Sequence, residues 1–229
     1  ARERKVENYE SSAWHFRHFV LGAFAIFFYV GIEIGIPSQV NFYLADANGN
    51  GAFPAGFVGG AAIGGAIAAI YWLLMMVGRA CSSAISGKIS TRAQMITVCS
   101  VAIALVLAAI FTSKEFTVQM PGYSAADGFA MFEVPVSCLF LVLCGLCTSL
   151  MWGAIFNLAV EGLGKYTEQA SGIFMMLVVG GGIMPFIQNI VAKNAGYINS
   201  YWLVIAMLVY LLYYAVAGCK NVNKDIKVD

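Results

Sequence analysis

Long apolar stretches, separated by short groups of charged residues, make up most of this chain. The charge-free stretches are 47–78, 93–113, 134–160, 169–192 and 194–219. A helix needs about 20 consecutive apolar residues to cross a bilayer, and each stretch is at least that long. The segment 18–44 also qualifies, apart from the carboxylate of Glu33. The pattern therefore predicts six membrane-spanning helices.

Composition supports this class of protein and argues against a soluble one. The 229 residues are 60% hydrophobic and 11% charged, whereas about 25% of a typical soluble domain is charged. A membrane barrel would show alternating segments of about 10 residues, and these stretches are longer and apolar on all sides. We predict an all-α, polytopic membrane protein with a cytoplasmic linker at 1–17, a six-helix transmembrane bundle at 18–219 and a cytoplasmic tail at 220–229.

The positive charges indicate how the bundle is oriented. Eleven of the 13 lysine and arginine residues fall in segments that six crossings place on one side of the membrane: Arg2, Arg4, Lys5, Arg17, Arg79, Lys88, Arg92, Lys165, Lys220, Lys224 and Lys227. Lys114 and Lys193 remain on the other side. Basic residues collect on the cytoplasmic side of membrane proteins, so both termini are expected in the cytoplasm.

The polar start of the chain reads as a linker. The segment 1–12 begins with Ala1 and has no apolar region, so it does not resemble a signal peptide. We expect the chain to be a fragment or a processed form of a longer protein.

Glu33 is the most informative residue, because a charge at the bilayer centre costs about 2.5–3.5 kcal/mol on insertion scales. It can face a water-filled cavity, pair with a cation or stay protonated. Arg79, the nearest basic residue within a span, lies toward the cytoplasmic end of its helix, so a direct pair is not expected. A water-filled cavity is the preferred interpretation.

Helical spacing adds polar neighbours to Glu33. Tyr29, Glu33, Pro37 and Asn41 recur every four residues, with a drift of about 40° per step. Carboxyl and carboxamide groups suit a ligand rich in hydroxyls. Gln39, beside this stripe, joins the candidate binding set. The alternative is a structural polar cluster that joins helices.

Aromatic and polar residues of other spans extend the candidate site. Tyr71 and Trp72 lie near the middle of the second span and could stack on a sugar ring, although simple packing toward lipid is as plausible. Trp152 and Asn157 lie in the fourth span, where Asn157 could instead join helices. Arg79, Lys88 and Arg92 are assigned to a cytoplasmic gate or orientation element.

Small residues predict close helix packing at two places. Gly56, Gly60, Gly64 and Ala68 recur every four residues and would let a neighbouring helix approach. Gly180–Gly182 with Pro185 predict a bend in the fifth span, either tolerated by packing or lining a pathway. Cys144 and Cys147 form a CxxC pair without polar neighbours, so we expect packing and no metal site.

Enzyme motifs fail on inspection. The stretch GLGKYT at 162–167 lacks the spacing and the preceding strand of a phosphate loop. His15 and His18 lie at the edge of the first span, too shallow for an intramembrane serine protease, and HExxH does not occur. Channel filter signatures do not occur either. We expect no enzyme activity, no cofactor and no metal.

Four stretches resemble a known family. FFYVGIEIGIPSQVNFYL (27–44), YWLLMMVGRACSSAISGKIS (71–90), FNLAVEGLGKYTEQASG (156–172) and VVGGGIMPFIQNIVAKNAG (178–196) are similar to the carboxyl-terminal half of the fucose–galactose–proton symporters of the major facilitator superfamily, in particular the bacterial glucose/galactose branch. The segment Ala80–Ser82 departs from the family's usual pattern of a bulky residue and a glycine after the arginine.

The resemblance implies half of a twelve-helix carrier in a bacterial inner membrane. It implies a sugar site between two six-helix bundles, alternating access, proton coupling and an amino-terminal half as partner, with the bilayer as surroundings and no nucleic acid. Glu33, Asn41, Tyr71 and Trp72 are the residues to which a family role carries over. The alternatives are a facilitator for another small polar solute and a module that does not transport.

Overall fold

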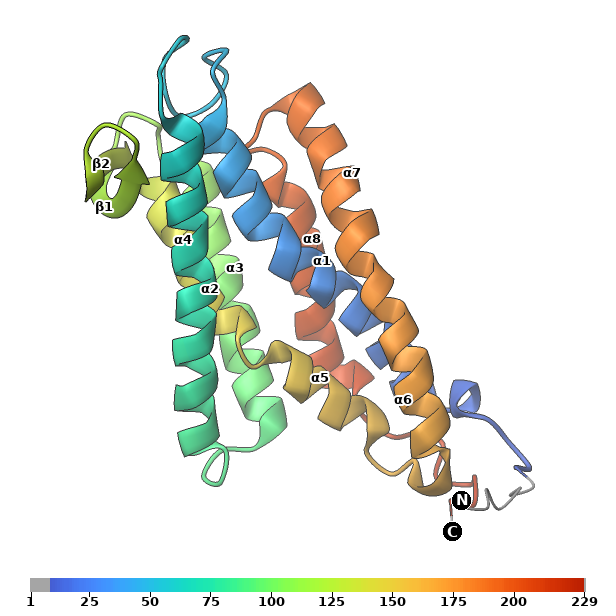
Figure 1. Ribbon diagram of the computed structural model, residues 1–229. Helices are drawn as coiled ribbons and strands as arrows, with labels where there is room; N and C mark the ends of the chain where they lie inside the picture. The colour runs from blue at the N-terminus through green and yellow to red at the C-terminus, as the bar shows by residue number, and fades with distance from the viewer. Residues whose placement is uncertain (1–8, 229) are drawn as a thin grey trace, which may run out of the picture.

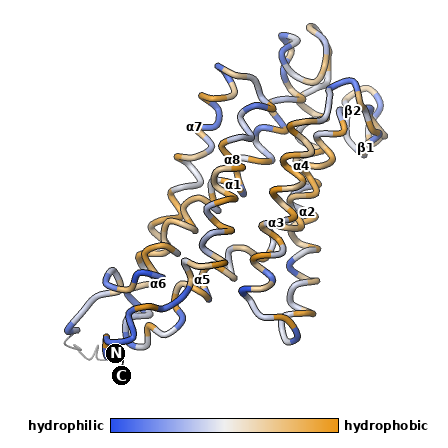
Figure 2. Tube along the Cα trace, turned by 180° about the vertical axis from the view of Figure 1, so that it is seen from behind, coloured by the Kyte–Doolittle hydropathy of each residue, from blue (hydrophilic) through white to orange (hydrophobic). Residues whose placement is uncertain are grey.

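The computed structural model describes residues 9–228, so the predicted charges at Arg2, Arg4 and Lys5 lie outside the described residues (Figure 1). Within this described part, six helical spans are long and apolar enough to cross a membrane: Arg17–Ala45, Gly60–Ile85, Thr91–Phe111, Val136–Val160, Gly164–Ala195 and Tyr201–Gly218. Figure 2 shows these spans as mostly hydrophobic, with hydrophilic residues concentrated toward the two ends. The predicted all-α class with six spans is confirmed.

Three spans are single helices and three are assembled from pieces. The first three are α1 (Arg17–Ala45), α2 (Gly60–Ile85) and α3 (Thr91–Phe111). The fourth comprises α4 (Val136–Thr148) and α5 (Met151–Val160), which meet at an angle in Figure 1. The fifth joins α6 (Thr167–Met176) to α7 (Gly180–Ala195) through a 3₁₀ turn at Leu177–Val179, and the sixth continues α8 (Tyr201–Tyr213) as a π-helical turn at Tyr214–Gly218.

The connections alternate between the two ends of the bundle. The first and last described residues lie at one end in Figure 1, together with the loops that join α2 to α3 and α5 to α6. The α1–α2 loop, the α3–α4 connection and the α7–α8 turn lie at the other end. Six crossings require this arrangement.

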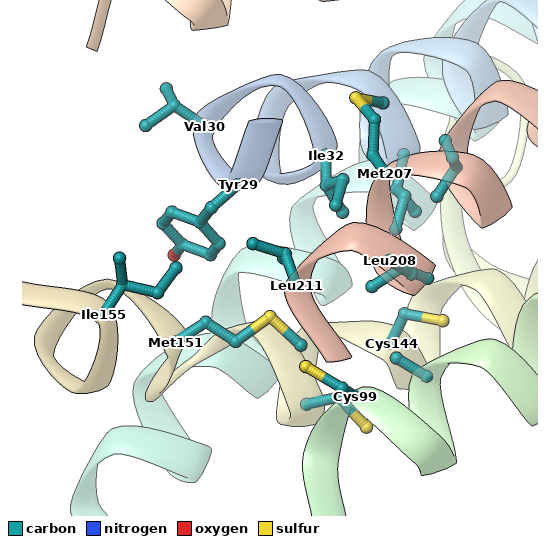
Figure 3. Close-up of a cluster of buried hydrophobic side chains, with 14 of the residues drawn as sticks. Tyr29, Val30, Ile32, Cys99, Cys144, Met151, Ile155, Met207, Leu208 and Leu211 are labelled. Atoms are coloured by element: carbon teal, nitrogen blue, oxygen red, sulfur yellow. The ribbon is translucent and has the colours of Figure 1, made fainter. Parts of the chain in front are cut away.

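Helix α1 lies at the centre and contacts α2, α5, α7 and α8. Glycines make these contacts close: a Cβ on Gly31 would lie 2.5 Å from Met184 Cβ of α7, and one on Gly35 would lie 2.3 Å from Gln188 Oε1. Lipid supplies no hydrophobic drive between helices, so such close approach and the dispersion it brings hold the spans together. Figure 3 shows the core beside α1, where Cys144 and Met151 pack among leucines and isoleucines.

Helix α2 begins later than the charge-free stretch from residue 47 suggests. It starts at Gly60, because residues 46–59 form turns, and Gly59 adopts a φ of 97° that favours glycine. Gly56 therefore belongs to the loop and contributes nothing to the predicted ladder. Gly60 and Gly64 do face α1, since added Cβ atoms would lie 2.4 Å from Leu44 O and 2.7 Å from Asn41 Oδ1.

The connection between α3 and α4 contains two strands, although strands were considered unlikely. β1 (Thr117–Ser124) and β2 (Gly128–Pro135) pair antiparallel, with Thr117 opposite Pro135 and Ser124 opposite Gly128. The hairpin packs against α2. The segment was treated only as a loop, so its alternating burial pattern was not considered. The hairpin lies outside the spans, so the membrane bundle remains all-α.

Candidate functional site

Glu33 and Arg79 form an ion pair within the bundle. Glu33 Oε1 lies 3.9 Å from Arg79 Nη2, and the Glu33 side chain is only 17% exposed. The expectation that Arg79 would be too far along its helix was wrong. Side chains of a helix tilt toward its amino terminus, so the long arginine side chain reaches back from the end of α2 toward the level of Glu33.

The pair lines a polar cavity, as predicted for Glu33. The cavity has a volume of about 640 Å³ and lies between α2, α3 and the α4–α5 region. Its lining comprises Glu33, Arg79, Ser82, Ser86, Thr91, Gln94, Ser149, Leu150, Trp152, Gly153, Ala154 and Asn157. Glu33 and Arg79 are the charged members of this lining, so the field inside the cavity is set by one carboxylate and one guanidinium.

A second cavity continues past the ion pair. It has a volume of about 330 Å³ and is lined by Glu33, Trp72, Met75, Met76 and Arg79. The Trp72 side chain is 45% exposed, so its indole ring is accessible beside the pair. Glu33 and Arg79 therefore separate two spaces, one polar and one lined by an indole and two thioethers.

The ion pair is anchored to the interruption in the fourth span. Arg79 Nε donates to Ser149 O at 3.2 Å, and the Tyr29 hydroxyl donates to Thr148 O at 3.1 Å. The hydroxyl groups of Tyr71 and Thr148 lie 2.8 Å apart. Donors from α1 and α2 thus satisfy backbone carbonyls at the buried end of α4.

Five of the predicted site residues line these cavities: Glu33, Arg79, Trp152 and Asn157 line the polar one, and Trp72 lines the other. Trp152 stacks on Phe156 with ring centroids 5.6 Å apart and planes 13° apart. An aromatic face beside hydroxyls and carboxamides suits a ligand with an apolar face and polar edges.

The remaining predicted binding residues lie elsewhere. Tyr29 and Tyr71 are fully buried behind the ion pair, and Figure 3 shows the Tyr29 ring among core side chains such as Ile155. Gln39 is 1% exposed, and Asn41 packs against Gly64 of α2. The structure therefore divides the predicted stripe, because the central helix α1 presents successive turns to different neighbours.

The three predicted gate residues have different surroundings. Arg79 belongs to the ion pair, and Lys88 is exposed in the α2–α3 loop. Arg92 Nε donates to Ala215 O at 2.9 Å, and its Nη2 donates to Val216 O. Arg92 therefore joins the start of α3 to the π-helical turn that ends the sixth span.

Five polar residues of the cavity were not predicted: Ser82, Ser86, Thr91, Gln94 and Ser149. Arg79, Ser82 and Ser86 lie on one helix face by their spacing, so periodicity could have identified the two serines. Gln94 gave no such signal. Ser149 precedes Asn157 by eight residues on one helix face, but the interruption that frees its carbonyl has no proline or glycine at residues 148–150.

Comparison with known proteins now adds sequence and fold relationships. A glucose/galactose transporter of Brucella abortus (biovar 1, strain 9-941) is 32% identical over 214 residues, which cover 93% of this chain and 45% of the relative. A putative glucose/galactose transporter of Helicobacter pylori (strain J99) is 28% identical over 230 residues, which cover 96% and 48%. No protein-family model matches the chain. The chain therefore spans about half the length of the curated relatives it matches.

A solved structure has the same fold. The major facilitator superfamily transporter FucP, in its outward conformation, superposes with a TM-score of 0.69 over 87% of this chain and 42% of FucP, at 20% identity. The resemblance found in the sequence is thereby confirmed: the chain has the fold of half a major facilitator superfamily transporter and is similar in sequence to half of the glucose/galactose transporters.

Proposed function

We propose that this chain is the carboxyl-terminal half of a proton-coupled sugar transporter that works by alternating access. The observation that carries the proposal is the Glu33–Arg79 pair at the junction of two cavities inside a membrane bundle. Intramembrane ionisable residues are costly and usually mark a transport pathway. The names of the relatives favour a hexose such as glucose or galactose as the substrate.

The polar cavity provides the chemistry for a sugar. Glu33, Gln94 and Asn157 offer carboxyl and carboxamide groups, and Trp152 offers an aromatic face. Sugar hydroxyls both donate and accept hydrogen bonds, which such groups satisfy. In this proposal, Glu33 and Asn157 bind hydroxyls, while Trp152 packs against the ring and Trp72 closes the opposite side of the ion pair.

The ion pair provides a means of proton coupling. Protonation of Glu33 would remove one charge of the pair, so Arg79 would lose an attraction that low-dielectric surroundings strengthen. A proton and a sugar hydroxyl would thus act on the same carboxyl group, which couples their binding. The basic residues at the end that carries the termini support a cytoplasmic location of that end.

The test is uptake of radiolabelled D-galactose and D-glucose by the full-length carrier in proteoliposomes, with and without an inward proton gradient. Accumulation above equilibrium that requires the gradient supports a symporter. Equilibration at the same rate with and without the gradient would indicate a facilitator. An absence of flux for both sugars would overturn the transport proposal.

A pair of matched variants assigns the role of Glu33. We expect Glu33→Gln to abolish gradient-driven accumulation, while Glu115→Gln, at an exposed acid outside the bundle, leaves uptake within twofold of wild type. Equal uptake by both variants would contradict a role for Glu33 in coupling.

A further inference from the structure

The interruption between α4 and α5 leaves backbone carbonyl and amide groups without hydrogen-bond partners from a continuous helix. The hydrogen-bond pattern of α5 begins with Ala154 N, which donates to Leu150 O at 3.0 Å. The carbonyls of Thr148 and Ser149 therefore end one helix, and the amides of Trp152 and Gly153 begin the next. In a continuous helix these same groups would bond to each other, Thr148 to Trp152 and Ser149 to Gly153.

Side chains of two other helices take the place of those amides. Tyr29 of α1 donates to Thr148 O, and Arg79 of α2 donates to Ser149 O, at 3.1 and 3.2 Å. A buried carbonyl without a partner costs about 1–3 kcal/mol, so these two donors stabilise the interruption. A close contact fixes the position as well, because a Cβ on Gly78 would lie 2.4 Å from Ser149 Oγ.

We propose that the α4–α5 interruption is a switch between a broken and a continuous helix, and that Arg79 connects it to the charge on Glu33. Arg79 uses Nη2 toward the carboxylate of Glu33 and Nε toward Ser149 O, so one guanidinium contacts both the binding site and the interruption. This inference rests on the proposed function, since it assigns a conformational response to the same site.

The direction of the response follows from the exposure of the two side chains. The Arg79 side chain is 59% exposed and that of Glu33 is 17% exposed, so loss of the carboxylate charge leaves the guanidinium free to move into the cavity. Ser149 O then loses its donor and bonds to the Gly153 amide. Neutral Glu33 thus favours the continuous helix, and charged Glu33 favours the broken one.

Two groups connect Glu33 to the fourth span. The titratable side chains that face Glu33 are Arg79 and Tyr71 from α2 and Tyr29 from α1, with Cys144 of α4 facing Tyr71. Within the lining of the polar cavity, α3 and α5 contribute uncharged residues. Tyr29 and Arg79 both donate to carbonyls at the interruption, and Arg79 is the charged one, so it responds most directly to the charge on Glu33.

Hydrogen–deuterium exchange of the full-length carrier in nanodiscs tests this inference, with peptides covering residues 146–156. We expect Glu33→Gln to slow exchange at Trp152 and Gly153 about fivefold, which is the effect of one additional hydrogen bond. Arg79→Gln should slow exchange similarly. Simple loss of a structural contact would accelerate exchange instead, so unchanged or faster exchange overturns the switch.

Two buried tyrosines provide a matched pair of variants. Tyr29→Phe removes the donor to Thr148 O and should also slow exchange at Trp152. Tyr71→Phe removes a hydroxyl that contacts only the Thr148 side chain, which retains Cys144 O and Gly145 O as partners, so exchange should stay within twofold of wild type. Equal effects of the two variants would overturn the role of the carbonyl.

The outcome separates this inference from the proposed function. Binding of D-galactose and D-glucose is measured by isothermal titration on the same samples at pH 5.5 and 7.5. Normal binding by the wild type, together with unchanged exchange in Glu33→Gln, would overturn the switch and leave transport standing. Lack of binding to the wild type with both hexoses, together with slowed exchange in Glu33→Gln, would overturn the sugar site and leave the switch standing.

Discussion

The contact between α1 and α7 allows a prediction in which three neighbouring glycines differ in how much alanine should destabilise the protein. Gly180, Gly181 and Gly182 follow one another at the start of α7, and a methyl group on each would meet different surroundings. On Gly180 it would lie 2.1 Å from Phe27 O, on Gly181 it would lie 2.6 Å from Val30 Cγ1, and on Gly182 it would meet nothing within 4 Å. Alanine scanning of this triplet therefore measures how closely the two helices pack.

The size of the effect at Gly180 can be worked out from the distance. An ordinary contact needs about 3.4 Å, so α7 would have to move away from the α1 backbone by about 1.3 Å. Overpacking of this kind costs about 3 kcal/mol, and alanine returns about 1 kcal/mol through its better helix propensity. We expect Gly180→Ala to lose about 2 kcal/mol and to lower Tm by roughly 4–8 °C.

The two neighbours serve as controls. Gly182→Ala gains helix propensity without a clash and should raise stability by about 0.5–1 kcal/mol. Gly181→Ala would meet Val30 Cγ1 and Ile34 Cδ1, and the β-branched Val30 is stiff in a helix, so we expect a loss of stability between the results for its two neighbours. Thermal unfolding of purified variants in one detergent, followed by tryptophan fluorescence, gives the order. Equal Tm values for Gly180→Ala and Gly182→Ala would refute the close approach of α7 to the α1 backbone.

Three further predictions address other parts of the chain. Cys81 is the exposed cysteine among the six, so a maleimide should label one thiol of this chain under native conditions and none after Cys81→Ala; two or more labels would contradict burial of the others. Burial and the 2.7 Å hydrogen bond to Asp46 raise the pKa of Tyr197 to about 12, so this bond should persist above pH 10, the usual tyrosine value, and be lost as the pH rises through about 12. Asp46→Asn should lower that pKa in ¹³C NMR of labelled tyrosine, and an unchanged value would exclude the carboxylate as a cause. Arg92→Gln should lower stability by about 1–3 kcal/mol because two carbonyls of the π-helical turn lose a charged donor, while Lys88→Gln should change it by less than about 0.5 kcal/mol; equal Tm values would argue against the link.

The spans and the position of Glu33 at a polar cavity could be predicted from the sequence because both depend on solvation. A charge-free stretch of sufficient length must cross the membrane as a helix, and an acid within it must find water or a partner. The start of α2 was placed at Gly56, four residues early, because residues 47–59 carry no charge and the four-residue spacing of small residues runs from the loop into the helix. The glycines at 49, 51, 56 and 59 were the better signal.

The composition of the site was harder to predict because it depends on tertiary packing. The four-residue stripe through Tyr29 and Asn41 assumed that α1 has one wet face, whereas α1 is surrounded by neighbours and its turns contact different helices. The Arg79 pair was missed because depth was judged from the position of its Cα, although its side chain reaches back by several ångströms. The interruption after Thr148 arises from donors on α1 and α2, which no local sequence pattern reports.

The placement of both described ends on one face has a practical consequence for labelling this protein. Arg17 N donates to Asn223 Oδ1 at 3.0 Å, and Lys165 N donates to Val228 O at 3.2 Å, so the last residues pack beside the first helix and the α5–α6 loop. A fluorescent tag attached directly to this end would disturb the contacts that these last residues make with α1 and the α5–α6 loop. A flexible spacer of several glycine and serine residues would move such a tag clear of the bundle.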